Sequence, residues 1–166
     1  MSIQKDIFSA VVFIIAAVVF LSYCFFPGHA SIDATSQFVM AVTGSFDDWH
    51  SYLYSLIWHW VLPLGSPSGG IFYFNTLIWV SAVWYFINIY IKNLIFASII
   101  SFLIIFFPPF FMQSSLLQKE SLFISIGLWC IVILIQLSKT SSKNKMNVLL
   151  VILNLLIFIL GNIRHD

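Results

Sequence analysis

The sequence predicts an all-α protein that crosses a membrane several times, and three observations support this fold class. Of the 166 residues, 61% are hydrophobic and only 8% are charged. The mean hydropathy of +1.02 lies far above that of soluble globular domains. The apolar residues form separate runs of about 20 residues, the length of a membrane-spanning helix. We therefore expect a single all-α polytopic membrane domain over residues 1–166, with about five transmembrane helices and two interfacial helices.

Turn signals separate the candidate spans. Pro27 and Gly28 follow the first span, and a polar stretch over residues 138–147 separates the last two. Pro108 and Pro109 are expected to end or kink the third span, because proline removes a backbone donor and clashes one turn back. The spans are predicted over residues 7–27, 71–91, 94–112, 121–137 and 148–163.

The first apolar run has a second interpretation. A secretory signal peptide would be cleaved after small residues, and Gly28 and Ala30 have that spacing. The run is about 20 residues long, however, which exceeds the usual apolar region of a signal peptide, and further spans follow. A membrane span is the favoured interpretation.

The positive-inside rule orients the chain with its N-terminus inside and the loop over residues 28–70 outside. In this orientation Lys119 and Arg164 lie outside with all four histidines and every acidic residue except Asp6. The sequence thus predicts a polar outer face on this membrane protein. No basic run is long enough to follow a nucleic-acid backbone, so no nucleic-acid partner is expected. The cytoplasmic basic residues are Lys5, Lys92, Lys139, Lys143 and Lys145.

Two helices are predicted inside the loop over residues 28–70. The first covers residues 32–42, with Ser31 as its N-cap and Asp33 in its first turn. Asp33 and Gln37 are one turn apart and share a face. The second helix begins after Asp47 and Asp48, either of which is a candidate N-cap.

This second helix is predicted to be amphipathic and to lie at the membrane interface. Such a helix would hold neighbouring polar groups at the depth of lipid head groups. Its apolar face would carry Trp49, Leu53, Leu56, Ile57 and Trp60, opposite Ser51, Ser55 and His59.

Several polar residues have both a structural and a functional interpretation. Asp33 would stabilise the helix dipole of its own first turn. Lys119 and Arg164 would be anchors at the ends of spans, or cations that hold a phosphate beside a carboxylate such as Glu120. Asp48 and His50 supply too few ligands for a metal site, so no cofactor is predicted, with a divalent metal as the alternative.

Cys24 and Cys130 both fall inside apolar runs. They are predicted to be small buried side chains rather than disulfide partners.

Four stretches, taken in chain order, resemble the N-terminal part of a polytopic glycosyltransferase of the GT-C superfamily. This superfamily includes the protein O-mannosyltransferases and the lipid A aminoarabinose transferases. The stretches are FPGHASIDATSQ after the first span, DDWHSYLYSLIWHW before the second, FFPPFFMQSSLLQKESLF between the third and fourth, and LGNIRHD at the end of the fifth.

The resemblance implies transfer of a sugar from a polyprenyl-phosphate donor to a cell-surface glycan or lipid at the outer face of the membrane. Asp33 would be the catalytic base, and Lys119 and Arg164 would neutralise the donor phosphate. Asp48 and His50 would shape the acceptor region. The implied substrate-binding residues are Gln37, Asp48, His50, Lys119, Glu120 and Arg164.

The sequence also departs from the family pattern. Ser51 stands where proline is expected, Glu120 where aspartate is expected, and Asp166 where asparagine is expected. The superfamily's shared core has seven spans, so five predict an incomplete module. The alternatives are a non-catalytic accessory protein that binds a lipid-linked sugar or a second membrane subunit, and a non-functional relic.

Overall fold

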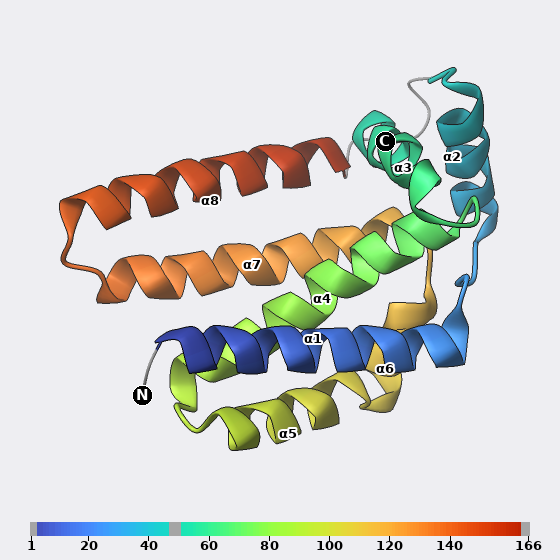
Figure 1. Ribbon diagram of the computed structural model, residues 1–166. Helices are drawn as coiled ribbons and strands as arrows, with labels where there is room; N and C mark the ends of the chain where they lie inside the picture. The colour runs from blue at the N-terminus through green and yellow to red at the C-terminus, as the bar shows by residue number, and fades with distance from the viewer. Residues whose placement is uncertain (1–2, 47–50, 164–166) are drawn as a thin grey trace.

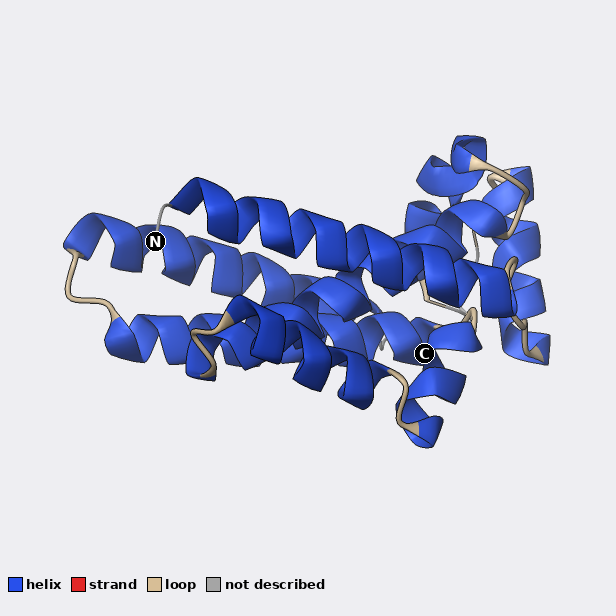
Figure 2. Cartoon of the chain, turned by 60° about the horizontal axis from the view of Figure 1, so that its bottom comes forward, coloured by secondary structure: helices blue, strands red, loops and turns tan. Residues whose placement is uncertain are grey.

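The computed structural model describes residues 3–46 and 51–163, and in this part of the chain the structure is built from helices. Long helices lie alongside one another, and two short helices gather at one end of this bundle (Figure 1). The start of α1 and the end of α8 lie at opposite ends of the molecule (Figure 2). The helices are α1 (Ile3–Phe25), α2 (Ile32–Thr43), α3 (Tyr52–Val61), the 3₁₀ helix η1 (Leu62–Leu64), α4 (Gly69–Tyr90), α5 (Leu94–Ile105), α6 (Pro108–Ser115), α7 (Lys119–Lys139) and α8 (Lys143–Ile163).

Among the described residues, four helices are long and apolar enough to cross a membrane: α1 from Phe8, α4, α7 and α8. Of the spanning window of α4, 56% is buried inside the protein, against 11% for α1 and 17% for α8. The helix α4 is therefore central, whereas α1 and α8 expose apolar side chains such as Val19 and Phe158. This exposure is typical of helices that face lipid, because exposed apolar side chains are stable against hydrocarbon but not against water.

The predicted third span, residues 94–112, is not one continuous helix. It divides into α5, which ends at Ile105, and α6, which begins at Pro108. Proline is well suited to the first position of a helix, where its missing N–H has no partner to lose. The 12 residues of α5 are about 18 Å long, too short to cross a hydrocarbon core of about 30 Å alone. The expectation that Pro108 and Pro109 interrupt this span is confirmed.

The prediction for α2 is confirmed nearly to the residue. The Ser31 side chain accepts a hydrogen bond from the N–H of Ala34 at 3.1 Å, so Ser31 is the N-cap. At the other end, Gly44 adopts a left-handed φ of 67° and donates its N–H to the Met40 carbonyl. This is the usual glycine termination of a helix.

The predicted N-cap of α3 is wrong. Ser51 holds that position, and its hydroxyl accepts from the N–H of Tyr54 at 3.3 Å. Asp47 and Asp48, the predicted caps, lie outside the described residues. The Ser51 hydroxyl also donates to the Asn162 carbonyl at the end of α8, at 3.3 Å. The local sequence around α3 could not predict this contact, because Asn162 belongs to a distant helix.

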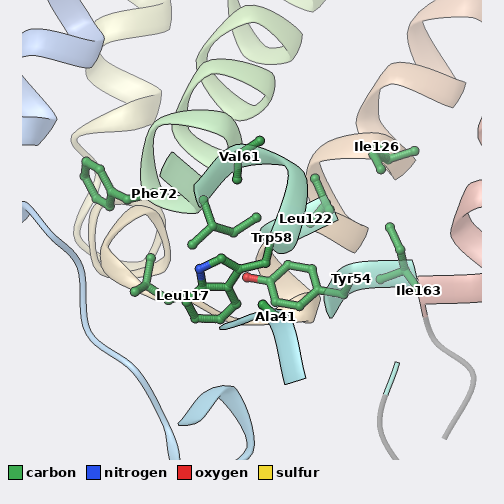
Figure 3. Packing of buried hydrophobic residues seen from close by; sticks show 10 residues of the cluster. Ala41, Tyr54, Trp58, Val61, Phe72, Leu117, Leu122, Ile126 and Ile163 are labelled. Carbon is green, nitrogen blue, oxygen red and sulfur yellow. The ribbon is translucent and has the colours of Figure 1, made fainter. Parts of the chain in front are cut away.

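The polar face predicted for α3 is wrong for Ser51 and Ser55, which are buried, whereas His59 is exposed as predicted. The Ser55 hydroxyl donates to the Ser51 carbonyl and needs no water. Tyr54 and Trp58 point into the main core, where they meet side chains from α4, α7 and α8 (Figure 3). Trp60, on the predicted apolar face, is 68% exposed, as a residue at a membrane interface would be.

The two cysteines do not pair. Cys130 is buried, as predicted, but Cys24 is exposed on α1, so the prediction of burial is wrong for Cys24. An apolar run does not distinguish a side chain that contacts lipid from one that contacts protein, which is why burial was predicted for both cysteines.

Candidate functional site

A backbone bridge between distant segments positions the candidate site. The N–H of His29 donates to the Ser115 carbonyl at 2.8 Å, and the N–H of Leu117 donates to the His29 carbonyl at 2.9 Å. The chain after α1 thus runs beside the chain between α6 and α7 (Figure 1). As a result, the first turn of α2 lies next to the first turn of α7.

These two helix starts form a polar pocket of about 130 Å³. Four residues that the sequence predicted as site residues line it: Asp33 and Gln37 from α2, and Lys119 and Glu120 from α7. The sequence predicted that these residues lie on the same side of the membrane, and the structure brings their side chains together in one pocket. Ser31, Ala34 and Gln118 complete the lining.

The side chains of the pocket differ in exposure. Asp33 and Glu120 are exposed, and each lies in the first turn of its helix, where a carboxylate complements the helix dipole. Gln37 is 1% exposed, and its Nε2 has no hydrogen-bond partner among the described residues. A buried amide nitrogen without a partner is costly unless a ligand or water satisfies it. The pocket therefore offers one cation, two carboxylates and an amide donor.

Three other predicted site residues, Asp48, His50 and Arg164, lie outside the described residues. Their place relative to the pocket is therefore still a prediction. Within residues 3–46 and 51–163, no three His, Cys, Asp or Glu side chains come together as a group that could hold a metal ion.

The buried contact between α3 and α4 holds a polar pair that sequence reasoning missed. The Asn75 amide of α4 donates to the Tyr54 hydroxyl of α3 at 3.3 Å, and both side chains are buried. Burial raises the pKa of Tyr54, the hydrogen bond from Asn75 lowers it, and the charge of Glu120 adds to the rise. The signal in the sequence was Asn75 itself, a polar residue in an apolar run.

His59, predicted on a polar surface, has a structural role. Its Nδ1 lies 2.6 Å from the Ala41 carbonyl near the end of α2. This contact joins α3 to α2. Neither His29 nor His59 is among the residues that line the pocket.

An apolar groove of about 480 Å³ runs between α4, α7 and α8. It extends from Ile57 of α3 to the level of Gln136, whose amide donates to the Tyr85 hydroxyl at 2.6 Å. Its walls are mostly aliphatic and aromatic, so it suits a hydrocarbon chain or an apolar helix.

Comparisons with protein-family models, with curated proteins and with solved structures found no match to this chain.

Proposed function

We propose that the chain is a membrane glycosyltransferase module that uses a polyprenyl-phosphate sugar as donor. The acceptor would be a cell-surface glycan or lipid at the outer face of a bacterial cytoplasmic membrane. The observation that supports this proposal is the convergence of Asp33, Gln37, Lys119 and Glu120 in one pocket at the end of an apolar bundle. A lipid-linked substrate needs this combination of a polar pocket and an apolar surround.

In the proposed reaction, a carboxylate acts as the base and a cation stabilises the leaving phosphate. The Asp33 carboxylate takes the proton of the acceptor hydroxyl as that oxygen bonds to the sugar carbon. The bond from this carbon to the donor phosphate breaks, and the phosphate leaves with the electron pair. The Lys119 ammonium offsets the charge on the departing phosphate. The Gln37 amide nitrogen, which lacks a partner among the described residues, donates to an oxygen of the donor.

Replacing Asp33 with asparagine tests this assignment. Asp33→Asn keeps the shape of the side chain and removes the proton acceptor, so we expect sugar transfer to be lost while membrane insertion is retained. Transfer is measured with purified protein, a set of ¹⁴C-labelled polyprenyl-phosphate hexoses and membrane acceptors. Asp6→Asn is the matched control, because Asp6 belongs to α1 and is predicted on the opposite side of the membrane. Unchanged transfer by Asp33→Asn would remove Asp33 as the base.

The apolar groove supports a second candidate function. An apolar groove along α7 and α8 also suits a helix of a larger membrane enzyme, and only 17% of the α8 window is buried. In this case the chain would be a non-catalytic accessory subunit that presents a lipid-linked sugar. It would co-purify with a second membrane protein, and Asp33→Asn would not change that association.

A further inference from the structure

A second, smaller polar pocket lies inside the bundle, apart from the candidate site. It is lined by Asn75, Thr76 and Trp79 of α4, and by residues of α6 and α7 such as Ser114 and Ser125. All three α4 side chains are more than nine-tenths buried, with exposures of 6%, 2% and 8%. The pocket therefore belongs to the helix interface rather than to the surface.

Each of these three side chains has a polar atom without a hydrogen-bond partner among the described residues. The atoms are Asn75 Oδ1, Thr76 Oγ1 and Trp79 Nε1. Two of the serines that line the pocket use their hydroxyls within their own helices, since Ser114 donates to the Phe110 carbonyl and Ser125 to the Ser121 carbonyl. Three buried polar atoms without a protein partner, on residues that line one pocket in an apolar bundle, indicate that the pocket binds a polar ligand.

The size and chemistry of the pocket define that ligand. Its volume of about 10 Å³ admits one group of the size of a water oxygen. Trp79 Nε1 only donates, Asn75 Oδ1 only accepts, and the Thr76 hydroxyl does both. A ligand that satisfies all three must both accept and donate. None of the described lining residues is charged, which disfavours an ion.

We propose that this pocket binds one neutral hydroxyl group, supplied by water or by the alcohol of a lipid. The hydroxyl accepts from the Trp79 indole and donates to Asn75 or Thr76. Because Thr76 both donates and accepts, the same ligand fits whichever way the Asn75 amide is turned. Asn75 also donates to Tyr54, so the bound hydroxyl extends the polar pair of Tyr54 and Asn75.

Proton NMR of the tryptophan indoles tests this proposal. The protein is labelled with ¹⁵N and placed in deuterated dodecylphosphocholine, which carries no hydroxyl, and cross peaks from each indole N–H are recorded. We expect the Trp79 N–H to show a cross peak to water. In a second sample with dioctanoylglycerol, a peak that moves from water to the glycerol protons identifies a lipid alcohol as the ligand. Trp79→Phe assigns the signal.

Trp58 is the matched control, because it is fully buried but its Nε1 already donates to the Pro67 carbonyl at 2.9 Å. No cross peak is expected there, and equal peaks at Trp58 and Trp79 would indicate general penetration and overturn the proposal. Absence of any peak at Trp79 would overturn it too. In Thr76→Val the ligand keeps two partners, so a weaker peak should persist. Complete loss would assign the signal to the Thr76 hydroxyl and contradict a bound ligand.

Discussion

At the scale of single residues, Gly28 decides whether the candidate site assembles. Its φ is +96°, and a Cβ added there would lie 2.6 Å from Leu117 Cδ2. Gly28 directly precedes the bridge residue His29. We therefore expect Gly28→Ala to break the bridge and to lower the free energy of unfolding by about 1–3 kcal/mol. Thermal unfolding in detergent, followed by circular dichroism, measures this change.

The control for this variant is Gly161→Ala. Gly161 lies in α8, and no atom comes within 4 Å of an added Cβ. Alanine should there raise the stability by up to about 1 kcal/mol through helix propensity. Equal stability of the two variants would mean that the approach of Gly28 to Leu117 does not hold the segments together.

The sequence predicted the four residues of the pocket but not their contact. The shared face of Asp33 and Gln37 follows from the helix period, and the charge distribution predicted that Lys119 and Glu120 lie on the outer side. What brings the two pairs together is a backbone bridge, which depends on N–H and carbonyl groups that every residue carries. No side-chain pattern records such a pairing.

At the scale of elements, Ser51 both caps the start of α3 and connects this helix to the end of α8. Ser51 caps α3 through Tyr54 and bonds to the Asn162 carbonyl of α8. We expect Ser51→Ala to lower the free energy of unfolding by about 1 kcal/mol, the usual cost of a lost N-cap. Chemical denaturation followed by tryptophan fluorescence measures this cost. Ser45→Ala is the control, because Ser45 is exposed and lies outside any helix. A loss of stability equal to that of the control would contradict the cap.

Helix positions were predictable where the signal is local. The predicted 32–42 and 71–91 match α2 and α4 within two residues, because caps and apolar runs define their ends. The failures concern properties that depend on partners. The buried face of α3 is set by its packing against α4, α7 and α8. The single span over residues 94–112 has a local cause instead: a hydropathy window averages over the break between α5 and α6, although the prolines at that break were recognised.

At the scale of the whole molecule, apolar composition predicted a multi-pass bundle, and the described part of the chain has four helices suited to crossing a membrane. The turns from α4 to α5 and from α7 to α8 lie at one end, with α2 and α3 at the other (Figure 1). The pocket is lined by residues at the starts of α2 and α7. Lys92, Lys139 and Lys143 lie at or beside these turns. This polarity supports the predicted orientation, with the pocket outside.

The number of crossings depends on α5 and α6, and cysteine labelling can determine it. Ser45 follows α2 and Ser141 follows α7, and both are exposed. If α5 and α6 together make one crossing, three crossings separate these positions. In a Cys24→Ser, Cys130→Ser background, an impermeant maleimide should then label Ser45→Cys in intact cells, and Ser141→Cys only after permeabilisation.

Labelling of both positions from one side would show an even number of crossings between them, so that α5 and α6 form a re-entrant pair. Exclusive labelling of Ser141→Cys in intact cells would invert the orientation. The pocket of Asp33 and Lys119 would then face the cytoplasm, and a donor presented at the outer face could not reach it. The same experiment therefore tests the topology and the side of the membrane on which the proposed transfer takes place.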